Sequence, residues 1–215
     1  IVVHLAAVQN SDPDVFQKNV AMMENILRYN KGKARIIFAS TNVLYGNICV
    51  ERAKQNENLR FGDSRKTELA TEKDPTIPTS KYGASKLACE NLLKIANLTD
   101  HIDYTILRFC AIVGPNTRFG AFKDLYEKVK GNQTVRAFGY MPGSKKNFLH
   151  VDDAANCILY MIRNPDKCSE ETFNVAGEGE VSIEKMINQI DEFVNPVGNK
   201  IKIEWNRLVS PTDNS

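Results

Sequence analysis

The apolar residues at the start of the chain form short continuous runs that are separated by a helix-like pattern. Residues 1–5 and 35–39 are apolar runs of strand length, and both are rich in β-branched or aromatic side chains. Between these runs, apolar positions recur with helical spacing over residues 16–29. A strand, a helix and a strand at this spacing predict a right-handed crossover and therefore a parallel sheet.

The middle of the chain adds another helix and a third strand. Residues 47–73 are polar and irregular, and we interpret them as a long surface excursion. We expect a helix from Tyr82 to about Thr99 and a strand over residues 101–109. Small residues then suggest a turn-forming segment over residues 110–115. These elements extend the predicted sheet by one strand.

Beyond Pro115 the elements become shorter. A clear amphipathic helix is expected over residues 151–162, with two acidic residues in its first turn, where they suit the helix dipole. Ser182 is placed to cap a helix that ends at Phe193. The other expected elements are a helix over 119–130, strands over 135–138, 147–150, 172–175 and 200–205, and a turn over 139–144.

The order of these elements predicts an α/β fold with a parallel sheet flanked by helices. We place the main domain at residues 1–115. Residues 116–215 are expected to form mainly a small α+β lobe, with some segments returning to the main domain.

Composition describes an ordinary globular chain and argues against several partners. The chain has 215 residues, 42% of them hydrophobic and 25% charged, with a formal net charge of +2. Such a charge gives no strong field for nucleic acid. No apolar run approaches the roughly 20 residues that span a bilayer, so we expect a cytoplasmic protein without a membrane partner. The five cysteines and three histidines show no metal-ligand spacing, so no metal site is expected.

The first candidate site is a tyrosine–lysine pair at the start of the second predicted helix. Tyr82 and Lys86 are four residues apart, so both face the same side of a helix. A fixed positive charge beside the phenol favours the phenolate, and we therefore expect Lys86 to lower the pKa of Tyr82 toward neutrality. Tyr82 would then suit general acid/base catalysis. The alternative is an ordinary solvated helix face.

A second candidate site follows the second predicted strand. Ser40 and Thr41 place two hydroxyl groups at the carboxyl end of that strand. In open α/β sheets ligands bind at this end. The alternative for Thr41 is a hydroxyl that bonds its own backbone.

Short motifs follow one another along the chain in a fixed order. They are His4-Leu-Ala-Ala7, Asn19-Val20, Phe38-Ala-Ser-Thr41 with Tyr45-Gly46, Tyr82-Gly-Ala-Ser-Lys86, Leu107-Arg108 with Gly114-Pro115, Asn147-Phe-Leu-His-Val-Asp-Asp153, and Phe173-Asn-Val175. Taken in this order, the motifs resemble the NAD-dependent epimerase/dehydratase family, the extended short-chain dehydrogenase/reductases that modify nucleotide sugars. The resemblance covers about residues 1–193 and implies a Rossmann-like domain.

The resemblance implies roles for particular residues. Thr41, Tyr82 and Lys86 match the catalytic set, with Tyr82 as acid/base and Lys86 on the nicotinamide ribose. Thr41, Asn42 and Lys146 are implied to contact a nucleotide-sugar substrate. The cofactor is implied to be NAD, with NADP left open, and the protein to be a homodimer. The implied cofactor-binding residues are Ala6, Ala7, Asn19, Ser40, Tyr82, Lys86, Phe109 and Ile112.

Several positions depart from the family pattern. Dehydratases of the family carry Asp-Glu where this chain has Asn42 and Val43, which argues against dehydration. An asparagine and an arginine of the family appear as Ala111 and Lys146, and lysine lacks the bidentate fork of arginine. The family's opening strand, glycine-rich turn and helix are missing before Ile1, so we expect the sequence to be part of a longer protein.

Two classes of function therefore remain. The first is an enzyme, either a nucleotide-sugar 4-epimerase that works through a transient 4-keto sugar or a reductase of a 4-keto sugar. The second is a non-catalytic NAD(P)-binding module whose substrate half has drifted. The complete set of Thr41, Tyr82 and Lys86 favours the enzyme over the binding module. Within the enzyme class, the resemblance to nucleotide-sugar 4-epimerases makes the epimerase the main expectation, with the reductase as the alternative.

Overall fold

The centre of the molecule is a parallel sheet. The structure is a computed structural model that describes residues 1–9, 11–46, 69–118, 120–136, 145–197 and 200–205. Four strands pair in the order β1-β2-β3-β8, all parallel, as the sequence predicted. They are β1 (Val2–His4), β2 (Ile36–Thr41), β3 (Tyr104–Phe109) and β8 (Glu171–Val175).

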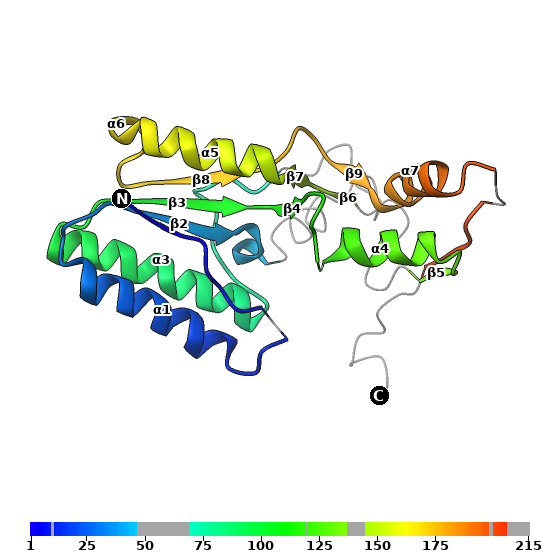
Figure 1. Cartoon of the computed structure of the whole chain (residues 1–215). Coiled ribbons are helices and arrows are strands. Elements are labelled where there is room, and N and C mark those ends of the chain that lie inside the picture. The colour runs from blue at the N-terminus through cyan, green and yellow to red at the C-terminus, as the bar shows by residue number, and fades with distance from the viewer. Residues whose placement is uncertain (10, 47–68, 119, 137–144, 198–199, 206–215) are drawn as a thin grey trace, which may run out of the picture.

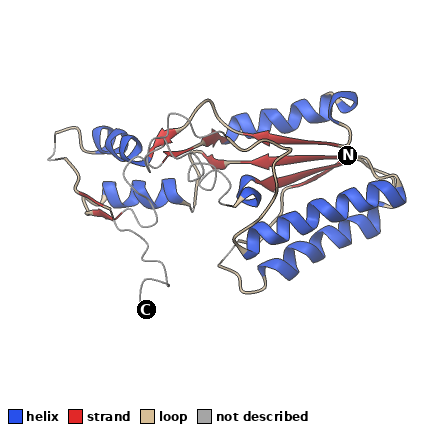
Figure 2. Ribbon diagram, turned by 180° about the vertical axis from the view of Figure 1, so that it is seen from behind, coloured by secondary structure: helices blue, strands red, loops and turns tan. Residues whose placement is uncertain are grey.

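Helices cover both faces of this sheet, which completes the expected α/β architecture (Figure 1). On one face lie α1 (Val15–Asn30) and α3 (Lys81–Asp100), which pack against each other. On the other face lie α5 (Val151–Arg163) and the short α6 (Pro165–Cys168), and Figure 2 shows the same layers from behind. Each face has its own buried apolar cluster, one centred on Phe38 and Leu93 and the other on Ile37 and Leu107.

The ends of α3 are fixed by local chemistry. The Ser80 hydroxyl accepts a hydrogen bond of 3.1 Å from the Gly83 N–H and thereby caps the first turn. At the other end His101 adopts a left-handed conformation with φ of 55°, and its N–H bonds the Asn97 carbonyl. His101 therefore ends a helix, and the third strand begins at Tyr104 rather than at residue 101 as predicted.

A smaller lobe lies beyond the carboxyl end of the sheet (Figure 1). It contains α4 (Ala121–Lys130), which packs against α7 (Ile183–Val194), and a short parallel pair, β5 (Val135–Arg136) with β10 (Ile203–Glu204). These elements share a separate apolar cluster that includes Val129, Ile187 and Val135. We propose that these elements form the lobe core and that α5, α6 and β8 belong to the main domain.

The segment over residues 110–115 differs from the prediction. Residues Ala111–Val113 form a strand, β4, which pairs in parallel with β7 (Phe148–His150). A turn was expected because small residues dominate the segment. The apolar Ile112 and Val113 instead find a partner strand more than thirty positions away, and such tertiary pairing overrides local propensity.

Other expectations are met or fall outside the described residues. The second strand runs on through Ser40 to Thr41, two residues further than predicted. Ser182 caps α7 by accepting from the Lys185 N–H at 3.1 Å, as predicted, and Val181–Ser182 (β9) pairs with Lys145–Lys146 (β6). Most of the predicted surface excursion (47–68), the expected helix start at Phe119, the end of the strand over 135–138 and the turn over 139–144 lie outside the described residues.

The described residues lack two features that would point to other classes of function. None of their helices is both long and apolar enough to cross a bilayer. Within the same residues, no group of three or more histidine, cysteine, aspartate or glutamate side chains is arranged to hold a metal ion.

Candidate active site

Helix α3 brings Lys86 and Tyr82 to the carboxyl end of β2. The Lys86 side chain is 2% exposed, and its Nζ donates a 2.8 Å hydrogen bond to the Ala39 carbonyl. The same Nζ lies 4.7 Å from the centre of the Phe38 ring and 5.8 Å from the centre of the Tyr82 ring. Lys86 is therefore part of a buried site and not of a solvated helix face.

Burial controls the ionisation of this site, in a direction that the sequence did not predict. Burial raises the pKa of Tyr82 above its ordinary value, although a hydrogen bond with the Gln9 side chain acts in the opposite direction. Burial also lowers the pKa of Lys86 to about 8. The expectation that Lys86 lowers the pKa of Tyr82 is thus wrong for this structure, because burial, which disfavours the charged phenolate, has the largest effect on that pKa.

A buried histidine lies next to the lysine. His4 ends β1, is stacked on Phe38 with ring centres 5.4 Å apart, and is 5% exposed. Burial, and secondarily the charge of Lys86, lower the pKa of His4 to about 4. His4 is therefore neutral at physiological pH and does not compete with Lys86 for the role of cation.

Thr41 occupies the turn at the end of β2. It caps the 3₁₀ helix η1 (Asn42–Tyr45), and its Oγ1 accepts a hydrogen bond of 3.4 Å from the Val43 N–H. This distance is long for such a bond, so the backbone holds the hydroxyl only weakly. The residue is 8% exposed, whereas Asn42 is exposed beside it. The Thr41 hydroxyl thus does bond its own backbone, which was the alternative to a catalytic role, but this bond is weak.

Close packing holds η1 against the start of α3. A Cβ built at Gly83 would lie 2.9 Å from the Pro78 Cβ and 3.4 Å from the Val43 carbonyl oxygen. The first distance is too short for a real side chain, so only glycine fits beside Pro78, whereas the second is an ordinary contact with η1. Because Gly83 follows Tyr82 and Val43 lies two residues after Thr41, the contact brings the two candidate catalytic side chains to the same region.

Asn19 holds the segment that follows β1. Its Oδ1 accepts from the Val8 N–H at 2.9 Å, and its Nδ2 donates to the Val8 carbonyl at 3.2 Å and to Ser85 Oγ at 2.9 Å. Asn19 thereby ties this segment, with its small residues Ala6 and Ala7, to α3. The backbone of the segment is fixed beside Tyr82 and carries no bulky side chain at Ala6 or Ala7.

The remaining predicted site residues are distributed around this centre. The Ser40 hydroxyl donates to Glu90 Oε1 at 2.6 Å. Phe109 is buried at the end of β3, directly beside Thr41 in the sheet register, and Ile112 is 41% exposed on β4. Lys146 is half-buried on β6, which pairs with β9 in a two-stranded sheet separate from the main sheet that carries Thr41.

Comparison with models of protein families identifies the family of this chain. The model for the NAD dependent epimerase/dehydratase family matches residues 1–176, which include every element of the main sheet. The chain belongs to this family.

Individual relatives within the family are distant. A putative UDP-glucose 4-epimerase of Methanocaldococcus jannaschii is 28% identical over 124 residues, which cover 55% of this chain and 39% of the relative. A UDP-N-acetyl-alpha-D-glucosaminuronate decarboxylase of Bacillus cytotoxicus is 22% identical over 224 residues, which cover 97% of this chain and 63% of the relative.

Solved structures agree with the fold. UDP-glucuronic acid 4-epimerase from Bacillus cereus, in complex with UDP-glucuronic acid and NAD, has a TM-score of 0.77 and 23% identity. The match covers 96% of this chain and 63% of that chain. The chain therefore spans less than two thirds of the length of the relatives to which it is similar.

Sequence reasoning gave no role to a group of buried polar residues behind the family's catalytic positions. Glu90 is fully buried and holds Arg108 by two hydrogen bonds, Nε to Oε1 at 3.0 Å and Nη2 to Oε2 at 2.7 Å. Arg108 also donates to the Tyr45 hydroxyl at 2.7 Å. The available signal was a charged residue, Glu90, on a helix turn next to the buried Cys89 and Leu93.

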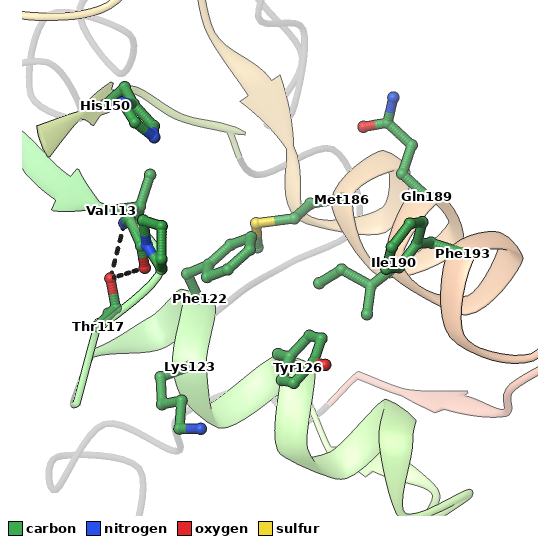
Figure 3. Close-up of a pocket in the computed structure, with 12 residues that line it drawn as sticks. Val113, Thr117, Phe122, Lys123, Tyr126, His150, Met186, Gln189, Ile190 and Phe193 are labelled. Carbon is green, nitrogen blue, oxygen red and sulfur yellow. Dashed lines mark hydrogen bonds between the residues drawn. The ribbon is translucent and has the colours of Figure 1, made fainter. Parts of the chain in front are cut away.

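A pocket in the lobe lies apart from these residues. It encloses about 610 Å³ and is lined by apolar side chains of α4 and α7, among them Phe122, Tyr126 and Ile190, together with His150 (Figure 3). The lining does not include Thr41, Tyr82 or Lys86. His150 has a structural role there, since its Nδ1 accepts from the Asp152 N–H at 3.3 Å and caps α5.

Proposed function

We propose that this chain is part of an NAD-dependent enzyme that inverts the C4 hydroxyl of a nucleotide sugar through a transient 4-keto sugar. The observation that carries the proposal is the buried Lys86 beside Tyr82 at the carboxyl end of β2, with Thr41 at the same end. A mere binding module has no need of a tyrosine that is positioned as an acid/base.

Each of three side chains has a separate role in the proposed reaction. Tyr82 takes the proton of the C4 hydroxyl as that carbon is oxidised, and returns a proton to the oxygen after the keto sugar has turned over. Thr41, whose hydroxyl is only weakly held by the Val43 N–H, orients the same oxygen. Lys86, whose Nζ lies 5.8 Å from the centre of the Tyr82 ring, binds the cofactor ribose beside the tyrosine and so orients the cofactor.

The residues at this edge suit a dinucleotide. Lys86 Nζ has three N–H donors, and the one hydrogen bond described for it is to the Ala39 carbonyl, so donors remain for a ribose hydroxyl. Asn19 fixes the segment with Ala6 and Ala7, and Phe109 and Ile112 stand at the ends of neighbouring strands. Ser40 contributes its backbone here, since its hydroxyl donates to Glu90. Bound NAD supplies reversible hydride transfer at C4, and the protein supplies binding, orientation and proton transfer.

The residues around Thr41 support epimerisation over dehydration. Elimination of water from a keto sugar requires an acid and a base near C5 and C6. Asn42 and Val43 provide neither, and both side chains are exposed beside the turn. Lys146 is proposed to neutralise the diphosphate of the substrate as a point charge, with Asn42 as a further polar contact.

The assembly and location of the protein are parts of the same proposal. We propose a homodimer in the cytoplasm. The outer side of the α1–α3 layer supports the dimer, because Tyr29, Ile95 and Leu98 are 77%, 55% and 79% exposed there.

The experiment that tests this function uses the full-length protein. UDP-glucose, UDP-galactose and their N-acetyl forms are supplied separately with a trace of NAD, and the sugars are followed by NMR. We expect C4 interconversion of at least one pair without net consumption of NAD. Conversion of a 4-keto sugar only, with stoichiometric use of NADPH, would assign the alternative reductase. NAD binding without any conversion would assign the binding module.

A further inference from the structure

A buried ion pair joins the helix that carries Tyr82 to two strands of the sheet. Glu90 is on α3, one turn after Lys86 and two turns after Tyr82. Its carboxylate receives the two hydrogen bonds from Arg108 of β3 and a third, of 2.6 Å, from the Ser40 hydroxyl of β2. Ser40 immediately precedes Thr41, and Glu90 lies on the same helix as Tyr82. Glu90 therefore links the helix that carries Tyr82 to the strand that leads into Thr41.

The other end of the Thr41 turn is tied to the same ion pair. The Arg108 Nη1 donates to the Tyr45 hydroxyl at 2.7 Å, and its guanidinium lies 5.1 Å from the centre of the Tyr45 ring. Tyr45 is the last residue of η1, and its hydroxyl donates in turn to Asn174 Oδ1 on β8 at 2.7 Å. The turn from Thr41 to Tyr45 is therefore anchored to the Glu90–Arg108 pair at both ends.

The ion pair is costly if its only role is stability. Glu90 is fully buried and Arg108 is 4% exposed, and transfer of two such charges from water costs about as much as their attraction returns. Apolar residues of the same volume would serve stability equally well or better. A geometric role explains the pair, because its three directional contacts define where β2, β3 and α3 lie relative to one another.

We propose that Glu90, acting through Ser40 and Arg108, is a positioning residue that sets the placement of Thr41 relative to Tyr82. This inference rests on the proposed function, in which both side chains act on one sugar oxygen. Glu90 itself makes no contact with substrate. Its carboxylate fixes the turn from which Thr41 projects, and misplacement of a catalytic group by about 1 Å costs on the order of a hundredfold in rate.

The test is the variant Glu90→Gln in the full-length protein. Glutamine keeps the shape of the Glu90 side chain. Its NH₂ group, however, cannot accept a hydrogen bond and replaces a carboxylate oxygen that accepts from Arg108 or Ser40. We expect kcat to fall about tenfold to a hundredfold, with the KM for the nucleotide sugar changed less than about threefold. Tyr45→Phe removes only the hydroxyl between Arg108 and Asn174, and we expect it to lower kcat by a smaller factor without a large change in KM. If Glu90→Gln does not fold, the result for Tyr45→Phe tests the positioning role in its place.

Thr105→Val is the matched control. Thr105 is fully buried on β3, like Arg108, but lies toward the opposite end of the strand, where its hydroxyl donates to the Cys168 carbonyl at 2.5 Å and accepts from Arg35. Its replacement deletes buried hydrogen bonds without reaching the Thr41 turn. We expect this control to lower stability while it leaves kcat within about twofold of wild type. An equal loss of kcat in Thr105→Val and Glu90→Gln would overturn the proposal, because the effect would then be general destabilisation.

Hydrogen exchange provides a readout that does not depend on the reaction. In Glu90→Gln the amides of residues 42–46 are expected to exchange faster, with no such change in Thr105→Val. If the wild-type protein fails to epimerise any sugar but this local change is seen, the proposed function fails and the role of Glu90 in holding the turn stands. If exchange over 42–46 and kcat are both unchanged in Glu90→Gln, the positioning role is refuted.

Discussion

At the scale of single residues, burial determines the acid–base chemistry of the site. The pKa of Tyr82 is raised and the pKa of Lys86 is lowered to about 8, both chiefly because their charged forms are removed from water. The periodicity of the sequence was sufficient to place Tyr82 and Lys86 on one helix face. The direction of the pKa shift was not predictable from the sequence, because it depends on β2, which packs against this helix through contacts distant along the chain.

The first prediction concerns the proton transfer. Tyr82→Phe removes the phenol but keeps the ring, so turnover is expected to fall by about 10² to 10⁴, the contribution of a positioned acid/base. Binding of NAD, measured by equilibrium titration, is expected to change little, because Lys86 and the segment held by Asn19 remain. Unchanged turnover would remove Tyr82 from the mechanism.

The second prediction concerns stability in acid. The pKa of His4 is about 4 in the folded protein and 6.5 in the unfolded chain, so the unfolded chain binds more protons between these values. The free energy of unfolding is therefore expected to fall by about 1–3 kcal/mol as the pH falls from 6.5 toward 4. Urea unfolding at several pH values measures the slope.

Two variants test whether this slope belongs to His4. His4→Phe keeps the aromatic contact with Phe38 but has no titrating group, so its slope below pH 6.5 should be smaller. His150→Asn, at an exposed cap that asparagine also fills well, should keep the slope of the wild type. Equal slopes in His4→Phe and wild type would exclude His4 as the source.

At the scale of elements, the site depends on how closely α3 approaches η1. The sequence predicted α3 from Tyr82 to about Thr99, close to its observed bounds, and the structure adds that Ser80 caps its first turn. β4 was not predicted, because its pairing with β7 joins segments that are far apart in the sequence. The sequence placed Ser40 after the second strand, whereas in the structure it lies within β2. The hydrogen bond from its hydroxyl to the buried Glu90 was therefore not predicted either.

The third prediction tests the close packing at the start of α3, where Gly83 faces both Pro78 and η1. In Gly83→Ala the new Cβ would lie 2.9 Å from the Pro78 Cβ, so α3 and the segment before it must shift apart near Tyr82. We expect turnover to fall about tenfold or more through misplacement of Tyr82. The free energy of unfolding should change by less than about 1 kcal/mol, because alanine gains helix propensity as it loses this contact.

A control separates the clash from helix propensity. Asn91 is exposed on the same helix, so Asn91→Ala improves propensity without contact with η1. Turnover of Asn91→Ala should match the wild type. A Gly83→Ala protein with wild-type turnover would show that the close approach is not needed for the reaction.

At the scale of the whole molecule, the sheet and the lobe have separate apolar clusters. The parallel sheet followed from the strand–helix–strand pattern of the sequence, because right-handed crossovers leave few other arrangements. The return of α5 and β8 to the main sheet was expected only in general terms. Which segment pairs with β3 is decided by side-chain packing of Phe173 and Val175 against Leu107 and its neighbours, and no local pattern encodes it.

The most direct test of the account follows the hydrogen at C4 of the sugar. The full-length protein is given the substrate pair that it interconverts, labelled with deuterium at C4, in ordinary water with a trace of NAD. Hydride removal and return within one site predicts that the product has inverted C4 and still carries deuterium there. Loss of the deuterium to solvent, or inversion at another carbon, would contradict the proposed reaction of Tyr82, Thr41 and Lys86.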